Sequence, residues 1–312
     1  MSFLNYLING LSLGSVYAII ALGYTMVYGI AKMLNFAHGD IIMVGAYVVF
    51  LCMKNAGLSP IVSIIIAMIA CTILGVVIEK VAYKPLRNVS SSLAVLITAI
   101  RGRHPRSASP LAVLITAIGV SYLLQNLALL IFGADAKSFT SVVSLKPIKL
   151  FDGQVSITGE AVVTIITCIV IMVGLTLFVN KTKAGKAMQA VSEDKGAAQL
   201  MGINVNATIT LTFAIGSALA AVAGALMCSA YPNLTPYSGT MPGIKAFVAA
   251  VFGGIGSIPG AMIGGLLIGV IEIIGKAYIS SQITDAIVFA ILVIVLLVKP
   301  TGILGKNIQE KV

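Results

Sequence analysis

The second half of the chain contains one long polar stretch, residues 180–206, which reads NKTKAGKAMQAVSEDKGAAQLMGINVN. It follows directly on an apolar run of membrane length and begins with three lysines, Lys181, Lys183 and Lys186. Positive charge beside a membrane span is typical of the cytoplasmic side. The stretch therefore predicts a cytoplasmic loop between two membrane spans.

Within this loop the residues predict one short helix. Ser192 is expected to be its N-cap and Gly202 to end it. Glu193 and Asp194 place negative charge in the first turn, where the helix dipole favours it. A helix of roughly nine residues is about 13 Å long and marginal by itself in water. Its small apolar side chains therefore predict a surface that another protein covers. They belong to Ala197, Ala198 and Met201.

The composition places the rest of the chain in a membrane. Hydrophobic residues make up 59% of it and charged residues 10%, whereas about a quarter of residues are charged in soluble globular domains. The net charge is +10, but the basic residues lie in short loops between apolar spans, so anionic lipid and topology explain them better than nucleic acid. The sequence predicts an all-α polytopic membrane protein, with residues 1–312 forming a single domain in a lipid bilayer.

The residue types needed for catalysis or metal binding are scarce. The four cysteines lie inside apolar runs without metal-ligand spacing and are expected to be packing residues. They are Cys52, Cys71, Cys168 and Cys228. With only two histidines in the chain, an intramembrane nucleophile and base or a metal set is improbable. We therefore expect no enzyme activity, no cofactor and no metal site.

The first half of the chain begins with one long and one short apolar segment. Residues 4–30 are long enough to cross a hydrocarbon core of about 30 Å. Residues 41–52 are too short for a comfortable crossing, so we expect a tilted or re-entrant helix whose N-terminus points into the protein. Asn35, His38 and Asp40 lie just before it. They either cap this helix in a loop at the membrane surface or form part of a translocation path, since transporters place ligand groups at broken helix ends.

An octapeptide occurs twice in the middle of the chain. LAVLITAI at residues 93–100 recurs unchanged at residues 111–118, with the basic decapeptide RGRHPRSASP between the copies. The second copy continues into a full span, so we assign a membrane helix to residues 111–132. The first copy is too short to cross and is placed at the cytoplasmic surface. Residues 89–110 are interpreted as a duplicated basic insert peculiar to this chain, and a functional basic insert is the alternative.

The longest loop on the opposite side of the membrane covers residues 133–159. Two short β-like runs, residues 141–145 and 148–151, precede the turn signal Asp152-Gly153, and a third, residues 154–157, follows it, which predicts a small β-hairpin. A periplasmic hairpin would suit the docking of a substrate-delivering receptor. Alternatively, it only covers the helix ends.

Four apolar segments follow in the second half of the chain. They are residues 161–179, 207–230, 244–275 and 283–298. Lysines after the last segment favour a cytoplasmic C-terminus, and alternation of sides then places the N-terminus in the periplasm. The third segment must leave and return to the same side, which gives about eight membrane helices in total, some of them short or re-entrant.

The third segment is interrupted by GGIGSIPG at residues 253–260. This run lacks the Gly-Lys-Ser/Thr ending of a phosphate loop, so we reject nucleotide binding. Two interpretations remain. The helix ends could expose backbone amides to a substrate carboxylate, or the glycines only allow close packing. The residues concerned are Gly253, Gly254, Gly256 and Ser257.

Glu272 is the charge most deeply set in an apolar segment. An ionisable residue inside a membrane span is expensive and is a functional candidate by default. Lys276 lies four residues further on, so an i,i+4 ion pair near the membrane interface is the simpler interpretation.

Three motifs together resemble one family, the permease subunits of bacterial high-affinity branched-chain amino-acid ABC importers. SEDKGAAQLMGI at residues 192–203 resembles the family's coupling loop. NFAHGD at residues 35–40 and GGIGSIPGA at residues 253–261 also resemble that family. So does the order of the apolar segments over nearly the whole chain, and the match is to the smaller of the family's two homologous permeases.

The resemblance implies a non-catalytic translocation subunit for leucine, isoleucine, valine and related apolar amino acids such as phenylalanine. It would pair with a second homologous permease and receive its substrate from a periplasmic amino-acid-binding protein. Two cytoplasmic ATPases would dock on the coupling loop (residues 181–206), at Glu193, Asp194, Ala197, Ala198 and Gly202. The candidate path residues are Asn35, His38, Asp40, Gly253, Gly254, Gly256 and Ser257. An ion-coupled secondary amino-acid transporter is the rival class.

Overall fold

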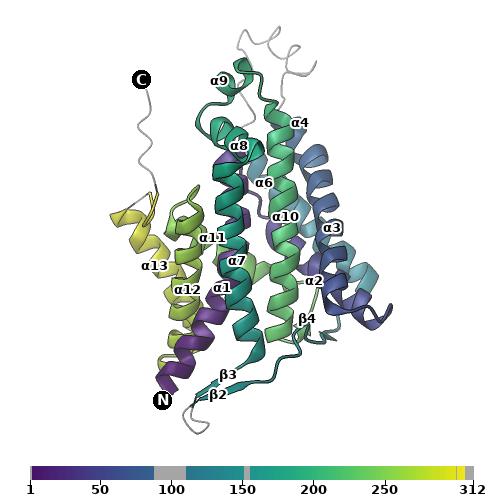
Figure 1. Ribbon diagram of the computed structural model, residues 1–312, viewed down its shortest axis with the longest axis vertical. Helices are drawn as coiled ribbons and strands as arrows, with labels where there is room; N and C mark the ends of the chain where they lie inside the picture. Colours follow the sequence, from purple (N-terminus) through teal and green to yellow (C-terminus); the bar gives the residue numbers. More distant parts are fainter. Residues whose placement is uncertain (1, 88–109, 151–154, 300, 306–312) are drawn as a thin grey trace.

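The computed structural model describes residues 2–87, 110–150, 155–299 and 301–305. Most of them lie in helices that run along the longest axis of the molecule (Figure 1). The helices are α1 (Ser2–Ala31), α2 (His38–Lys54), α3 (Pro60–Ile78), the π-helix η1 (Glu79–Tyr83), α4 (Lys84–Arg87), α6 (Pro110–Phe132), α7 (Gly159–Lys181), α8 (Lys183–Glu193), α9 (Lys195–Leu200), α10 (Val205–Ala230), α11 (Thr240–Gly253), α12 (Ile258–Tyr278) and α13 (Thr284–Val298).

Six of the described helices are long and apolar enough to cross a membrane. They are α1, α3 with its continuation to Leu86, α6, α7, α10 and α12. The shorter helices α2, α11 and α13 complete the bundle. This arrangement confirms the predicted all-α polytopic membrane fold with short helices among the full-length ones.

Helix α1 forms the centre of the bundle. It packs most extensively on α12 and also contacts α7, α10 and α11. Its most apolar window is 94% buried, whereas the corresponding windows of α3, α6 and α7 are 28%, 22% and 17% buried. The outer helices therefore direct rows of leucine, isoleucine and valine away from the bundle, as lipid contact requires.

Glycines bring α1 and α12 into backbone contact. A Cβ atom added at Gly14 would lie 2.7 Å from the Cα of Leu266, and one at Gly10 would lie 2.8 Å from the Cα of Val270. On the facing helix, a Cβ at Gly269 would overlap the backbone of Gly14. Small residues replace the hydrophobic effect as the means of helix association in lipid, because they allow close van der Waals packing.

Two short antiparallel strand pairs lie at the same end of the molecule as the start of α1 (Figure 1, bottom). β1 (Lys137–Ser138) pairs with β4 (Asn233–Leu234), which joins the segment after α6 to the segment after α10. β2 (Ile148–Leu150) pairs with β3 (Val155–Ile157). The second pair confirms the strands of the hairpin predicted around residues 152–153, while that turn itself lies outside the described residues.

The interrupted segment forms two antiparallel helices, α11 and α12. Gly253 packs against Gly260, and Gly264 packs against the backbone of Ala249. The end of α12 lies beside the start of α1, where the rings of Tyr6 and Tyr278 meet edge to face at 5.8 Å. The expected return of this segment to its starting side is therefore confirmed.

The repeated octapeptide is described in its second copy only. α6 covers that copy, which confirms the membrane helix assigned to residues 111–132. The first copy and all of the decapeptide except Pro110 lie within residues 88–109, which are outside the described residues. The interpretation of residues 89–110 as a duplicated insert therefore stays a prediction.

Candidate functional site

The coupling loop contains two short helices in place of the single helix predicted. α8 is capped by Thr182, whose Oγ1 accepts a hydrogen bond from the Gly185 N–H at 3.0 Å. α9 is capped by Asp194, whose Oδ1 accepts from the N–H groups of Gly196 at 2.7 Å and Ala197 at 3.0 Å. These bonds satisfy N–H groups that have no partner within the helix.

The prediction of Ser192 as an N-cap is wrong. Ser192 lies inside α8, and its hydroxyl donates to the Gln189 carbonyl at 2.7 Å. The next helix starts at Lys195, so the cap is Asp194 and Glu193 ends α8. An aspartate two residues further along is as good a cap as a serine, and the continuation of α8 decides between them.

The predicted end at Gly202 is confirmed. Gly202 has φ +82°, a conformation that glycine adopts without a Cβ penalty. Its N–H donates to the Gln199 carbonyl, and the Ile203 N–H donates to the Ala198 carbonyl, each at 3.0 Å. This pattern is a Schellman-type helix end.

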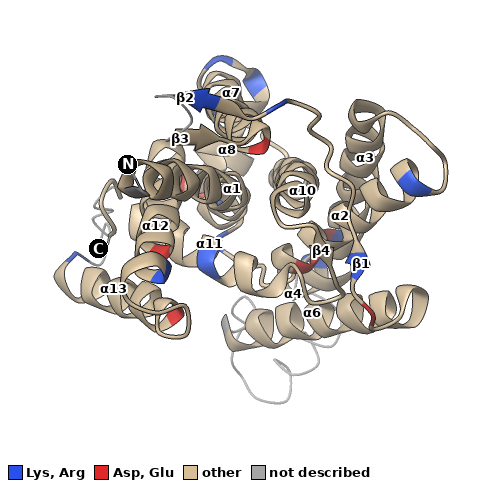
Figure 2. Cartoon of the chain, turned by 90° about the horizontal axis from the view of Figure 1, so that it is seen from below, with Lys and Arg blue, Asp and Glu red and all other residues tan. Residues whose placement is uncertain are grey.

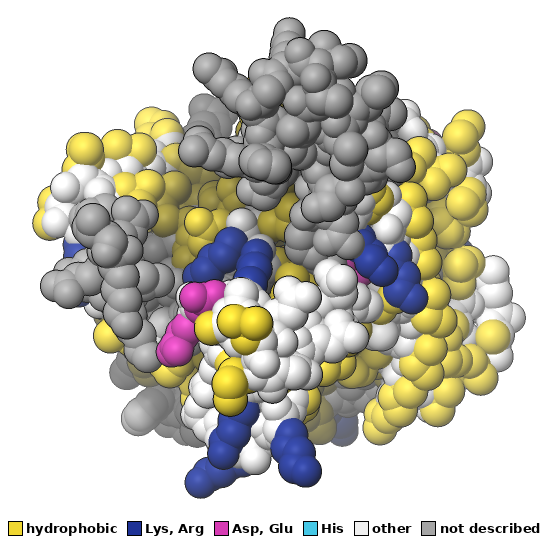
Figure 3. Space-filling view, turned by 90° about the horizontal axis from the view of Figure 1, so that it is seen from above, with side chains coloured by type: hydrophobic (Ala, Val, Ile, Leu, Met, Phe, Trp, Pro, Cys, Tyr) yellow, Lys and Arg dark blue, Asp and Glu magenta, His cyan; other side chains and the backbone are white. Residues whose placement is uncertain are grey.

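Helix α9 lies at the end of the molecule opposite to the strand pairs (Figure 1, top). Leu200 is 90% exposed and Met201 is 82% exposed, and Ala197 is also exposed. Figure 3 shows this end, where a small hydrophobic group lies beside acidic side chains with basic side chains around it. Ala198 points inward and is buried, so it does not belong to the predicted surface, whereas Leu200 does.

The start of α9 is bonded to the end of α1. The Lys195 ammonium donates to the backbone carbonyl of Ala31 at 2.8 Å. The next residue, Lys32, has φ +57° and is the one non-glycine residue with positive φ among those described. In the same connection, the Asn35 side-chain carbonyl accepts from the Tyr83 hydroxyl at 2.9 Å. The coupling loop thus holds the end of α1, and η1 holds the α1–α2 connection (residues 32–37).

Helix α2 begins inside the protein, earlier than predicted. It starts at His38 in place of residue 41, and its N-cap residue, Ala37, offers no side-chain cap. Asn35, His38 and Asp40 are all at least 97% buried. These side chains are enclosed by protein and do not lie in an exposed loop.

A cavity of about 330 Å³ lies between α1, α2, α6 and α11, and Asp40 is on its wall. The Gln125 amide of α6 donates to the Asp40 carboxylate at 2.9 Å and also reaches the Thr240 hydroxyl at 3.4 Å. The starts of α2 and α11 meet here through Gly39, where an added Cβ would lie 2.7 Å from the Gly239 carbonyl oxygen. Two broken helix ends and one buried carboxylate therefore share a cavity inside the bundle.

The glycine-rich break lies elsewhere and is filled by the chain itself. Gly254 and Gly256 have φ +107° and +95°. The Ser257 hydroxyl caps α12 by accepting from the Gly260 N–H at 3.2 Å. The Ile303 and Leu304 N–H groups donate to the carbonyls of Phe252 and Gly253 at 2.9 and 3.0 Å. The break residues do not line the cavity beside Asp40.

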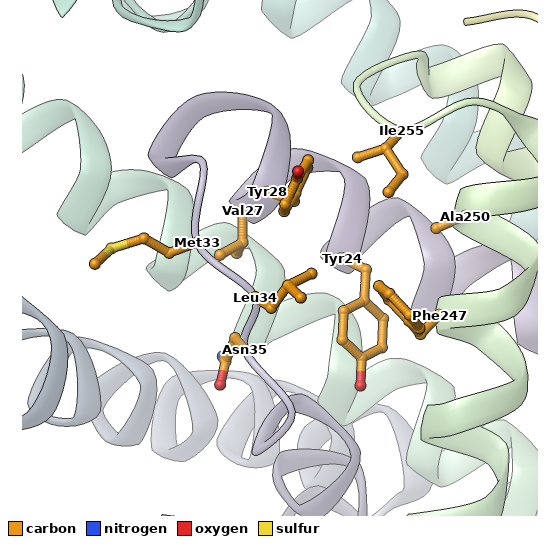
Figure 4. Close-up of a pocket in the computed structure, with 9 residues that line it drawn as sticks. All are labelled: Tyr24, Val27, Tyr28, Met33, Leu34, Asn35, Phe247, Ala250 and Ile255. Carbon is orange, nitrogen blue, oxygen red and sulfur yellow. The ribbon is translucent and has the colours of Figure 1, made fainter. Parts of the chain in front are cut away.

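A second, much smaller pocket joins the α1–α2 connection to this break. Its volume is about 10 Å³, which is room for one water at most. Figure 4 shows Asn35 and Leu34 on one wall, Tyr24 and Phe247 with adjacent rings, and Ile255 on the far side. Of the candidate path residues, Asn35 alone lines this small pocket and Asp40 alone lines the cavity of about 330 Å³, so the structure does not bring the whole set together.

The intramembrane charges form a larger group than the predicted ion pair. Lys276 contacts Glu272 at 2.6 Å, which confirms the i,i+4 pair. Glu272 also contacts Lys245 at 2.8 Å and accepts from the Tyr17 hydroxyl at 2.8 Å. Lys245 in turn contacts Asp285 at 2.6 Å. Figure 2 shows these charges on neighbouring parts of α11, α12 and α13.

Several of these residues were not identified from the sequence, although each gives a signal there. Gln125, Thr240 and Lys245 are polar residues in or beside apolar segments, which is the pattern that marks buried polar sites in membrane proteins. Their partners cannot be inferred from spacing, since Gln125 and Asp40 are 85 residues apart.

Membrane-length helices surround a cavity that contains a buried carboxylate, and short helices begin inside the bundle. These features define a class, the polytopic membrane transport proteins. A family model described as "Branched-chain amino acid transport system / permease component" matches residues 6–296. The chain belongs to this family and is a multi-pass permease of the inner membrane.

Relatives of known name support this assignment over the whole length. The chain is 44% identical to the "High-affinity branched-chain amino acid transport system permease protein LivH" of Salmonella typhimurium, over 99% of this chain and 98% of the relative. It is 42% identical to the corresponding protein BraD of Pseudomonas aeruginosa, with the same coverage. It is 31% identical to the "Probable branched-chain amino acid transport permease protein LivH" of Methanocaldococcus jannaschii, over 92% and 88%. The resemblance seen in the three motifs is confirmed, and the rival class of ion-coupled transporter finds no support among these relatives.

Proposed function

We propose that the chain is the translocation subunit of an ABC importer that moves leucine, isoleucine, valine and related apolar amino acids into the cytoplasm. The observation that carries this proposal is identity of more than 40% to high-affinity branched-chain amino-acid permeases over 99% of the chain. The subunit is not itself an enzyme. A second homologous permease would complete the membrane part, and a periplasmic amino-acid-binding protein would deliver the substrate.

Two cytoplasmic ATPases would supply the energy through the coupling loop. The exposed Leu200 and Met201 support this docking site, because apolar side chains of this size are covered in a stable assembly. Through the contact of Lys195 with Ala31, a docked ATPase would act on the end of α1. Movement of α9 would bias the helices between outward-open and inward-open states.

The proposed orientation follows from the coupling loop. If α8 and α9 face the cytoplasm, the start of α1 and both strand pairs face the periplasm, because they lie at the opposite end (Figure 1). The loop of residues 133–159 would then be available to the receptor. The segment after α13 would return to the cytoplasmic side.

The end of α9 at Gly202 has a backbone conformation that favours glycine, and we expect it to be essential for coupling ATP hydrolysis to uptake. Gly202→Val places a β-branched residue at φ +82°, which costs roughly 1–3 kcal/mol of backbone strain and displaces α9. In a reconstituted complex with receptor and ATPases, we expect leucine uptake and receptor-stimulated ATP hydrolysis to fall at least about tenfold, with receptor affinity unchanged. Gly57→Val is the matched control, because Gly57 also has positive φ, at +61°, and neither glycine has a neighbour within 4 Å of an added Cβ. Normal uptake by Gly202→Val would contradict the coupling role.

Crosslinking tests the orientation and the ATPase contact together. A cysteine at Met201, introduced after the native cysteines are replaced, should crosslink to the ATPase subunit in membranes, because this side chain is exposed beside α9. Leu145→Cys is the control, since Leu145 is exposed in the loop of residues 133–159. Crosslinks to the ATPase from residue 145, and none from residue 201, would reverse the proposed orientation.

A further inference from the structure

In the part of the chain that the structure describes, the buried Asp40 carboxylate has no basic partner. It is 2% exposed and accepts hydrogen bonds from two neutral groups, the Gln125 amide at 2.9 Å and the Ser121 hydroxyl. Among the described residues, none that lines the cavity beside it is Lys, Arg or His. Lys245 follows the lining residue Ile244 in sequence, but its ammonium contacts Glu272 and Asp285. Over the described ranges of the chain, the wall of the cavity therefore has one acidic side chain and no basic one.

Glu272 provides the comparison within the same bundle. Its carboxylate is equally buried, and it contacts the ammonium groups of both Lys245 and Lys276. A buried carboxylate is costly unless it is paired with a cation or neutralised. Lys245 occupies the position beside Glu272, whereas the position beside Asp40 is part of the cavity. A cation from outside the chain would complete the Asp40 site.

The remaining walls of the cavity indicate which other chemical groups the cationic ligand has. Phe36, Leu114, Ile118 and Ile244 supply an apolar surface, and the Ser121 and Thr240 hydroxyls lie beside Gln125. The volume of about 330 Å³ is that of a small-molecule pocket. The walls thus suit a small molecule with one ammonium group, one apolar side chain and a hydrogen-bond acceptor.

We propose that this cavity binds a zwitterionic apolar amino acid during transport, with the Asp40 carboxylate accepting hydrogen bonds from its ammonium group. The apolar side chain lies against Leu114, Ile118 and Ile244, and the ligand's carboxylate accepts from the hydroxyl of Thr240. This inference rests on the proposed function and adds a recognition site within the permease itself. It makes the permease, in addition to the receptor, a determinant of specificity.

Uptake by the reconstituted complex tests the role of the carboxylate. Asp40→Asn keeps the shape and removes the charge, so leucine uptake should fall at least tenfold, while receptor affinity and receptor-stimulated ATP hydrolysis stay within twofold of wild type. Asp135→Asn makes the same chemical change at an exposed position and should leave uptake unchanged. Normal uptake by Asp40→Asn would overturn the inference. If the wild-type complex takes up no leucine, the proposed function is wrong as well.

Gln125→Lys keeps the inference testable if Asp40→Asn does not assemble. The new lysine places a permanent cation beside Asp40, since the present amide nitrogen is 2.9 Å from the carboxylate. The complex should assemble, because the carboxylate gains a partner, but it should lose leucine uptake, because the ammonium site is occupied. Full uptake by this variant would show that Asp40 does not receive the substrate.

Direct occupancy can be measured by protection of the cavity wall. Ile118→Cys, in a chain without its native cysteines, places an accessible thiol at the cavity. L-Leucine should slow its alkylation at least threefold, and 4-methylpentanoate, which has the same side chain and carboxylate but no ammonium group, should not. Addition of Asp40→Asn should abolish the protection by leucine. Equal protection by both compounds, or protection by neither, would contradict ammonium recognition by Asp40, and a purely structural role of Asp40 would not produce this discrimination.

Discussion

Gly269→Leu should abolish the folded permease. Gly269 lies where α12 touches the backbone of Gly14 in α1, and any Cβ there overlaps main-chain atoms that no side-chain rotation can move. The two helices must separate along their whole contact, which is the most extensive one that α1 makes. We expect a loss above about 3 kcal/mol, the upper part of the range for overpacked interiors, in a protein whose total stability is of the order of 5–15 kcal/mol.

The measurement is the amount of monodisperse permease after extraction in mild detergent, together with its unfolding temperature. Gly174→Leu is the matched control, because Gly174 lies in the membrane helix α7 and an added Cβ there meets no atom within 4 Å. This control should be extracted in wild-type amounts. A Gly269→Leu protein that remains monodisperse at the wild-type unfolding temperature would show that α1 and α12 are not held by this contact.

Lys245→Met should produce the second large loss of stability. The substitution removes the ammonium between Glu272 and Asp285, and Glu272 is 1% exposed. Removing one partner of a buried ion pair leaves an uncompensated charge and costs about 3–5 kcal/mol. Lys276 still contacts Glu272, so we expect a loss near the lower end, about 3 kcal/mol, measured from the thermal unfolding of the purified permease.

A double-mutant cycle separates the pair from the packing of its side chains. Lys245→Met combined with Glu272→Gln should cost less than the sum of the two single changes, because the second change removes the charge that the first leaves unpaired. Lys276→Met is the control, since its side chain is 41% exposed and exposed pairs contribute about 1 kcal/mol or less. Strict additivity of Lys245→Met and Glu272→Gln would mean that their charges do not interact.

Local features of the fold could be predicted from the sequence where a residue pattern is compatible with only one local structure. Gly202 ends α9 as expected, because a helix end with positive φ favours glycine. The long helices could be predicted from the apolar runs, because a helix of that length crosses the bilayer and forms all its backbone hydrogen bonds internally. The Lys276–Glu272 pair followed from the helical repeat.

Other features depended on contacts that a single sequence does not contain. Ser192 and Asp194 are both good caps, and the choice was made by α8, which packs through Gly185, Met188 and Val191. Their spacing of three residues is a helical stripe and could have predicted α8. The partnership of Asp40 with Gln125 could not be predicted, because it connects helices that are distant in the chain.

The close fit of α1 against α12 also constrains the order of assembly in the cell. During synthesis α1 enters the membrane long before α12 exists, so the glycine surface of α1 has no permanent neighbour for most of translation. Final closure must await residues 303 and 304, whose backbone bonds to residues 252 and 253. The bundle is therefore completed only when the end of the chain is in place, and a chain cut before α12 leaves the glycine surface of α1 without its partner.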